Sequence, residues 1–126
     1  MMKKQILIKD RVRCVPGEGF SWIDRRFLRD YAERLSGDAI ALYFFLAAVS
    51  DKHGLSFYSD PTIAARLRMR ETAVVAAREE LVVQDLVAHQ PPLTQVLSLP
   101  PARVARAGLH GLRELARAWG NEEPDR

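Results

Sequence analysis

Three arginines at alternate positions, Arg66, Arg68 and Arg70, are the residues of this chain best suited to binding chemistry. A guanidinium group stays charged and donates several hydrogen bonds, so it suits phosphate oxygens. The candidate contact residues are these three arginines and the residues that follow them, which gives the set Arg66, Arg68, Arg70, Glu71, Thr72 and Val75. Arg25 and Arg26 form a second pair of candidate phosphate ligands, with the solvated face of a helix as the alternative interpretation.

Two helical patterns flank the three arginines. Ile63 and Leu67 lie four residues apart and stack on one side of a first helix, with Ala64 beside them. Ser59 or Asp60 suits the N-cap of that helix, and Pro61 suits its first turn. A second helix is predicted from about residue 71 to residue 84. Its inner face consists of Val74, Ala77 and Leu81.

A β-hairpin is predicted after the second helix. Its strands are Leu86–Gln90 and Thr94–Leu99, and Pro91-Pro92 forms the tip because proline is excluded from the interior of a sheet. Leu55–Tyr58 is expected to be a short strand that pairs with this hairpin.

This order of helix, turn, helix and hairpin resembles the winged helix-turn-helix of DNA-binding proteins. The matching positions are Ile63, Ala64, Leu67, Met69, Val74, Leu81, Leu86 and Val87. The resemblance implies a mainly α fold with a small β-hairpin wing, and double-stranded DNA as the partner. The chain departs from the family pattern at Arg68, where glycine is usual, and at Arg70, where a Ser or Thr cap is usual. The outward face of the second helix also carries two acids, Glu71 and Glu79.

Residues 20–99 are also similar to small winged-helix proteins encoded beside bacterial transposons and plasmids, and to the N-terminal domains of replication initiators. The motifs that carry this similarity are Asp24-Arg25-Arg26 and Gly54–Tyr58. It implies DNA binding in transcription regulation or as an accessory to a mobile element, and it fixes no catalytic residue.

The chain is predicted to consist of four segments. Residues 1–19 are predicted to be a strand or a basic arm, residues 20–99 the winged-helix domain, residues 100–119 a C-terminal helix and residues 120–126 a disordered tail. Within residues 20–99, Ser21 is expected to cap a helix whose stripe consists of Ile23, Phe27, Tyr31 and Leu35. A nearly all-apolar helix, buried in the core, is expected to start at Ser36 or Asp38 and to stop at Gly54. The C-terminal stripe is a possible homodimer surface, made of Val104, Leu109, Leu112, Leu115 and Trp119.

Charge and composition narrow the function further. The chain of 126 residues carries a net charge of +3, yet residues 37–98 hold seven acids against five basic residues. DNA contact is therefore expected to rely on the basic N-terminal segment as well. A single cysteine, Cys14, allows no internal disulfide, and the apolar helix is too short to span a bilayer, so a cytoplasmic location is expected.

Several residues have two interpretations. Cys14 is expected to be a small buried side chain, and Trp22 and Trp119 core or interface anchors. Val75, Val82 and Val83 lie off the inner stripe, which indicates either a thick core or a partner surface. The alternative function is therefore a protein–protein interaction module on the same scaffold. The chain lacks G-x-S-x-G, P-loop, H-E-x-x-H and paired-Cys motifs, so no enzyme activity, metal or cofactor is predicted.

Overall fold

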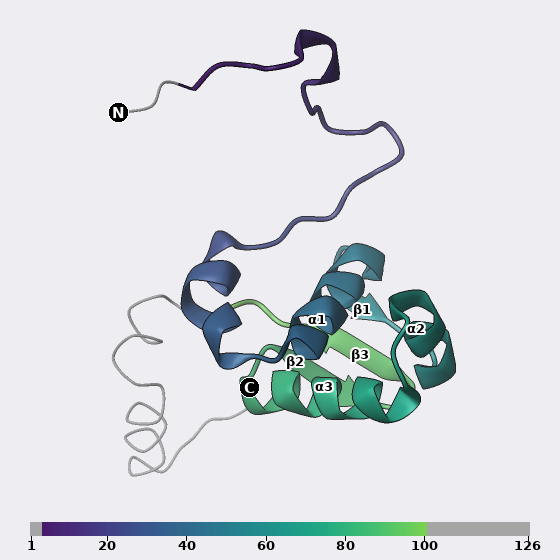
Figure 1. The fold of residues 1–126 in the computed structure, drawn as a ribbon. Helices are drawn as coiled ribbons and strands as arrows, with labels where there is room; N and C mark the ends of the chain where they lie inside the picture. The colour runs from purple at the N-terminus through teal and green to yellow at the C-terminus, as the bar shows by residue number, and fades with distance from the viewer. Residues whose placement is uncertain (1–3, 101–126) are drawn as a thin grey trace.

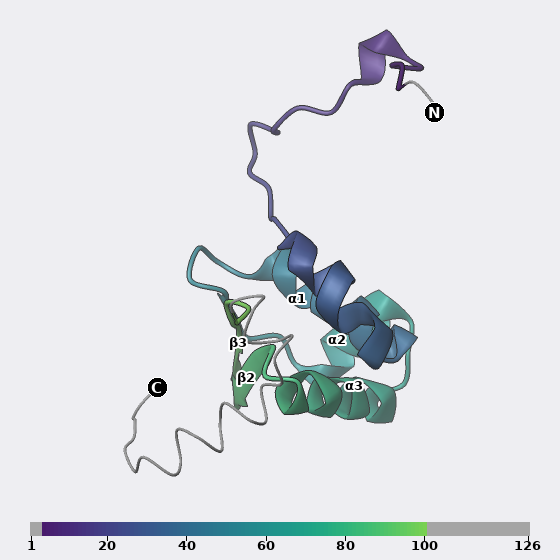
Figure 2. The same cartoon turned by 90° about the vertical axis from the view of Figure 1, so that its left-hand side faces the viewer.

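A computed structural model of the chain describes residues 4–100. This part is mainly helical and carries a small three-stranded antiparallel sheet, as the sequence predicted (Figure 1). The elements follow in the order α1 (Gly37–Val49), β1 (Leu55–Ser56), α2 (Asp60–Leu67), α3 (Glu71–Val83), β2 (Val87–Gln90) and β3 (Leu93–Val96). Figure 2 shows the three helices gathered on one side of the sheet. The predicted C-terminal helix and tail lie outside the described residues, except for Pro100.

Helix α1 is the centre of the core, as its apolar sequence predicted. The side chains of Leu42 and Leu46 are fully buried, and α1 packs against both α2 and α3. Ser36 caps α1, because its Oγ accepts a hydrogen bond from the Ala39 amide. Glu80 of α3 accepts two further hydrogen bonds from Ser36, at 2.9 Å from the amide and 2.6 Å from the hydroxyl. The start of α1 is therefore fastened to α3.

The two helices that flank the arginines form close to the predicted positions. Ser59 caps α2 by accepting a hydrogen bond from the Thr62 amide, and Pro61 lies in the first turn. The inner faces are confirmed, since Ile63, Val74 and Leu81 are buried. Helix α3 ends at Val83, and Gln84 serves as its C-cap.

The predicted hairpin is also confirmed, with slightly shorter strands. Strand β2 pairs with β3 from Val87 opposite Val96 to Gln90 opposite Leu93, which leaves Pro91 and Pro92 at the tip. The sheet order is β1-β3-β2, because β1 joins the outer side of β3. The prediction that α1 ends at Gly54 is wrong, because the helix stops at Val49. Gly54 instead turns the chain into β1 with a φ of +84°.

The helix predicted to start at Ser21 is shorter and less regular than expected. Helical turns begin only at Arg25 and continue as a π-helical turn, η2 (Phe27–Tyr31), and a 3₁₀ turn, η3 (Ala32–Arg34). Asp24 takes the capping role, because its carboxylate accepts a hydrogen bond from the Arg26 amide. The Ser21 hydroxyl donates instead to the Ala48 carbonyl of α1. Phe27 and Tyr31 of the predicted stripe are buried, but Ile23 is 44% exposed.

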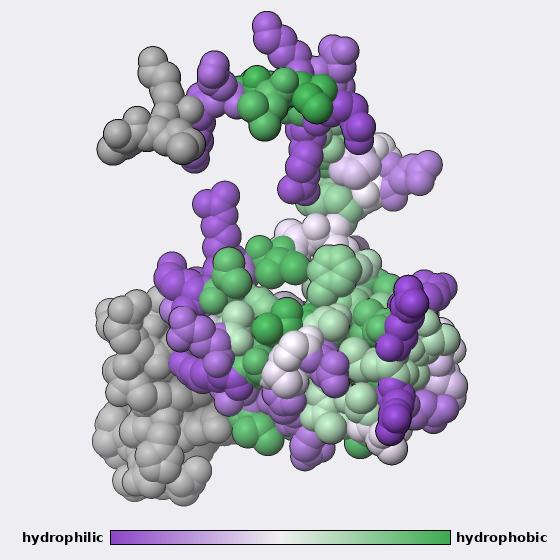
Figure 3. All heavy atoms as spheres, in the orientation of Figure 1, coloured by the Kyte–Doolittle hydropathy of each residue, from purple (hydrophilic) through white to green (hydrophobic). Residues whose placement is uncertain are grey.

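The N-terminal segment is an arm rather than a strand. Residues 4–19 are exposed throughout and contain one 3₁₀ turn, η1 (Lys9–Arg11). No strand among residues 4–100 pairs with the arm, and the arm runs away from the body in both ribbon views. Figure 3 shows apolar side chains gathered on this arm. The expectation that Cys14 is buried is wrong, since its side chain is exposed. Trp22 is 74% exposed, so its interpretation as a core anchor is wrong and the interface anchor stays a prediction.

Candidate nucleic-acid interface

The turn between α2 and α3 brings Arg66, Arg68 and Arg70 to one end of the body. All three side chains are exposed, and none forms an ion pair within residues 4–100. The turn is held by Met69, whose amide donates a 3.0 Å hydrogen bond to the Ala64 carbonyl and whose side chain is partly buried against the core. The backbone of the turn is therefore fixed while its arginine side chains face solvent.

Two of these arginines occupy backbone positions that other residues would fill at lower energy. Arg68 has φ 58° and ψ 45°, which lies in the left-handed region that glycine adopts most easily. Arg70 is the N-cap of α3, and its side chain accepts no capping hydrogen bond. Serine, threonine, aspartate or asparagine would satisfy an amide at that position. Both arginines thus reduce the stability of the turn that presents them.

The outward face of α3 is open but poor in groups that read bases. Its exposed residues are Glu71, Thr72, Val75, Ala76, Glu79, Val82 and Val83. The three valines are between 39% and 68% exposed, so the thick-core interpretation of these residues is wrong. Arginine, lysine, asparagine and glutamine make the commonest bidentate contacts to guanine and adenine, and this face holds none of them.

Arg78 is the one cation in the body of α3, and it points inward. The residue is only 8% exposed, and its guanidinium forms an ion pair with Asp60 in the first turn of α2. His89 of the hairpin lies close to this pair and bonds Thr94 through Nδ1 at 2.9 Å. Burial, followed by the nearby Arg78 cation, lowers the pKa of His89. The Asp60–Arg78 pair thus ties α2 to α3.

The position of Arg78 on the inner face of α3 was a sequence signal for its buried ion pair, and it did not enter the predictions from the sequence. Arg78 lies four residues after Val74 and three before Leu81, so it falls on the inner face of α3. A buried guanidinium requires an acceptor. Nothing local to α3 identified Asp60, eighteen residues earlier, as that acceptor.

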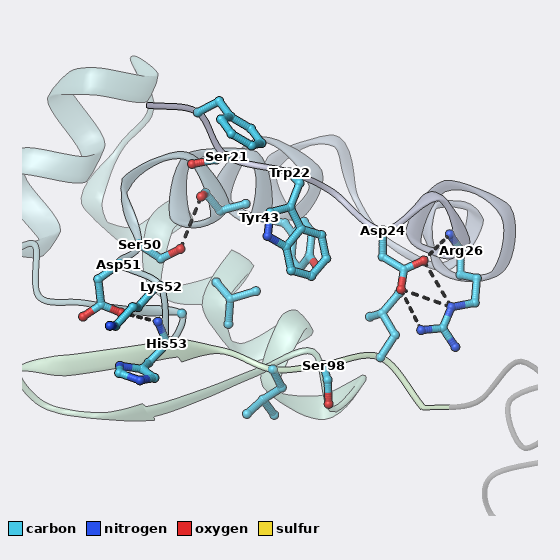
Figure 4. Close-up of a pocket in the computed structure, with 16 residues that line it drawn as sticks. Ser21, Trp22, Asp24, Arg26, Tyr43, Ser50, Asp51, Lys52, His53 and Ser98 are labelled. Atoms are coloured by element: carbon cyan, nitrogen blue, oxygen red, sulfur yellow. Dashed lines mark hydrogen bonds and ion pairs between the residues drawn. The ribbon is translucent and has the colours of Figure 1, made fainter. Parts of the chain in front are cut away.

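Arg25 and Arg26 do not join the arginines of the turn. They begin the helical turns drawn in blue in Figure 1, on the side of the body away from α2. Arg26 is engaged within the fold: it pairs with Asp24 at 2.6 Å (Figure 4), and its Nη1 donates to the Pro100 carbonyl at 2.6 Å. Arg25 is exposed. The second predicted phosphate pair therefore offers one unengaged cation rather than two.

Asp24 is expected to make the stability of the fold sensitive to acid. Hydrogen bonds from the Arg26 side chain and amide lower the pKa of Asp24 from 3.8 to about 2. The stability that this carboxylate contributes is thus present above pH 3.8 and is lost as the pH falls toward 2. Urea unfolding should show the parent and Asp24→Asn differing most at neutral pH and converging near the lower value. A difference that stays constant with pH would contradict this assignment.

The described residues offer no metal centre. Oδ1 of Asp51 accepts hydrogen bonds from the amides of His53 and Leu55 and so shapes the turn before β1. Residues 4–100 contain no group of three His, Cys, Asp or Glu side chains placed to hold an ion. Among the same residues, no helix has both the length and the apolar character required to cross a bilayer.

The geometry thus yields one exposed arginine cluster beside an open helix face. Comparison of the chain with protein-family models, with curated proteins and with solved structures finds no match.

Proposed function

We propose that this chain is a winged-helix DNA-binding protein that grips the phosphate backbone of duplex DNA through Arg66, Arg68 and Arg70. Regulation of transcription or an accessory role in a mobile element is the setting that the resemblance implies. The succession α1-β1-α2-α3-β2-β3 and the sheet order β1-β3-β2 support the winged-helix assignment. In that arrangement α3 is the helix that approaches the groove and the β2–β3 hairpin is the wing.

The observation that carries the proposal is the placement of Arg68 and Arg70 at positions that disfavour them. A left-handed backbone costs a residue with a Cβ about 1–2 kcal/mol, and an N-cap without a side-chain acceptor costs about 1 kcal/mol. Backbone features that reduce stability gather at functional sites, where the side chain has another role. The role open to two exposed, unpaired guanidinium groups is binding to an anionic partner.

Phosphate contacts are expected to dominate, and sequence preference is expected to be modest. The outward face of α3 offers only Thr72, the two acids Glu71 and Glu79 and small apolar side chains to base edges. Affinity for different duplexes should therefore vary little, while affinity for any duplex should fall steeply as salt rises.

The double variant Arg68→Gly/Arg70→Ser separates binding from folding. It removes two cations and supplies the residues that the turn prefers, so the free energy of unfolding should rise by about 1–2 kcal/mol. DNA binding should weaken nonetheless, and the slope of log K against log salt should fall by about 2. Fluorescence anisotropy with a mixed-sequence duplex at several salt concentrations measures the slope, and urea unfolding measures the stability.

The control is Lys52→Ser, which removes an exposed cation away from the turn. Its salt slope should equal that of the parent. If the turn variant is more stable but binds with unchanged affinity and slope, the arginines of the turn do not face DNA.

A protein–protein interaction module is the second candidate function. Val75, Val82 and Val83 favour it, because they are exposed on one helix and no element within residues 4–100 covers them. Absence of binding to any duplex at low salt would move this function ahead of the first.

A further inference from the structure

The N-terminal arm carries an apolar surface that nothing in the described residues covers. Five large side chains, Ile6, Leu7, Ile8, Val12 and Val15, are between 57% and 93% exposed. The hydrogen bonds of the arm are local, such as that from the Arg11 amide to the Ile8 carbonyl. Single exposed apolar residues are ordinary in proteins, but five within ten consecutive positions indicate a surface that another molecule covers.

The body shows a second uncovered apolar surface where the arm joins it. We call this the arm-side face; its exposed residues are Phe20, Trp22, Ile23, Leu28 and Phe44. Two cavities, of about 760 and 540 Å³, lie beside the chain here, and both are lined by Phe20 and Ser21. Figure 4 shows Trp22 above the larger cavity, between the Asp24–Arg26 pair and the turn at Asp51–His53. Phe44 of α1 lines the smaller one.

We propose that the protein forms a homodimer by reciprocal arm exchange, in which residues 4–15 of each copy lie across the arm-side face of the other. The arm is extended on both sides of the 3₁₀ turn at Lys9–Arg11, so Ile6 and Ile8 share one side of the first stretch, and Val12 and Cys14 share one side of the second. The large apolar side chains meet the partner body, and the Lys and Arg side chains stay in solvent.

The connection between arm and body supports exchange over folding back. Pro16–Gly19 forms a tight turn, in which the Gly19 amide donates to the Pro16 carbonyl at 3.3 Å. Gly19 itself has a φ of +106°, a conformation that favours glycine. This turn directs the arm away from its own body in both views of the ribbon (Figures 1 and 2). A short, conformationally restricted hinge is a feature that promotes exchange of an element between copies.

Charge and size both favour the body of a second copy as the occupant. Two arms would repel each other, since Lys4, Lys9, Arg11 and Arg13 oppose only Asp10 in residues 4–15. The body, residues 20–98, holds ten acids against nine basic residues and so would not repel the arm. Twelve residues span at most roughly 40 Å. The arm residues and the residues of the arm-side face together approach the ~20–30 residues that each partner contributes to a standard interface.

Cross-linking through the native cysteine tests which surface receives the arm. Cys14 is the only cysteine and is exposed, so a second one can be placed on the body by Phe44→Cys. The matched control, Val83→Cys, places it on α3 at a position of similar exposure. A short bis-maleimide should convert the Phe44→Cys chain to a covalent dimer well beyond the level seen for the parent and for Val83→Cys. Analytical ultracentrifugation of the uncross-linked full chain at tens of micromolar should also report a dimer, as expected for a micromolar Kd.

The other outcomes overturn the proposal. A monomer that gains an intrachain link between residues 14 and 44 means that the arm folds onto its own body. A dimer without increased cross-linking at residue 44 means that another surface, such as residues 102–119, joins the copies. A monomer without any link means that the arm is unpartnered.

A pair of arm variants checks the proposed orientation of the arm. Ile8→Asp/Val12→Asp changes two large apolar side chains of the arm and should weaken dimerisation at least tenfold. Its circular dichroism should match that of the parent, because these side chains lie outside the core. Lys9→Gln/Arg13→Gln changes two basic side chains of the arm and should leave the dimer largely intact. Equal effects of the two variants would contradict the assigned orientation.

Discussion

Replacing Gly54 by alanine is expected to lower the free energy of unfolding by about 3–4 kcal/mol, the largest effect predicted for this chain. Gly54 has a φ of +84°, where a Cβ alone costs about 1–2 kcal/mol. The added Cβ would also stand 2.5 Å from the Val96 carbonyl oxygen. That backbone is not free to move, because the Val96 amide donates a 2.8 Å hydrogen bond to the Gly54 carbonyl. Strand β1 would have to separate from β3.

Thermal unfolding followed by circular dichroism is the measurement, with Gly37→Ala as the control. Gly37 is the first residue of α1, and a Cβ added there meets nothing within 4 Å. Its replacement should be neutral or stabilising by up to about 1 kcal/mol. If both variants unfold at the temperature of the parent, the close approach of β1 to β3 at Gly54 is not as described.

Replacing Asp60 by alanine is expected to cost about 2–3 kcal/mol. The change leaves the Arg78 guanidinium, on a residue only 8% exposed, without its carboxylate partner. An uncompensated buried charge is far more costly than the pair itself is stabilising. The Asp60 side chain is 33% exposed, so water replaces part of what is lost, and the expected cost lies below that of a fully buried pair.

Two comparisons isolate the unpaired charge as the cause. The double variant Asp60→Ala/Arg78→Met should recover much of the loss, because it removes the charge together with its partner. Glu71→Ala removes an acid from the first turn of α3 that forms no ion pair in residues 4–100, and it should cost less than about 1 kcal/mol. Urea unfolding of the four proteins provides the free energies. A double variant as unstable as Asp60→Ala would contradict this explanation.

The Asp60–Arg78 pair also bears on the proposed function. Arg78 is the one cation of α3, and the fold uses it to hold α2 against α3. The exposed cations of this region are those of the turn, where they suit the phosphate backbone rather than base edges. Modest sequence preference is therefore expected even if α3 enters the groove.

The helices and the hairpin could be predicted because their signals are local. A side-chain period of 3.6 residues, the caps Ser36 and Ser59, and Pro91-Pro92 at the hairpin tip each act within a few residues. The segment 21–35 shows where local signals conflict. Ser21 and Asp24 both suit the N-cap of this helix. In the fold, the Ser21 hydroxyl donates to the Ala48 carbonyl, which lies far along the chain, and Asp24 accepts the capping hydrogen bond from the Arg26 amide.

Some features of the candidate site also follow from the sequence, and others depend on the tertiary structure. The sequence alone determined that Arg66, Arg68 and Arg70 lie around a turn between two amphipathic helices, since adjacent residues stay together in any fold. Only the tertiary structure decided that Arg68 adopts a left-handed backbone, that Arg26 is occupied by Asp24 and Pro100, and that Arg78 is buried against Asp60. The partner and the environment of a charged side chain come from segments that packing brings together. Sequence spacing therefore locates a cation along the chain, and the packed fold determines whether that cation is free to bind.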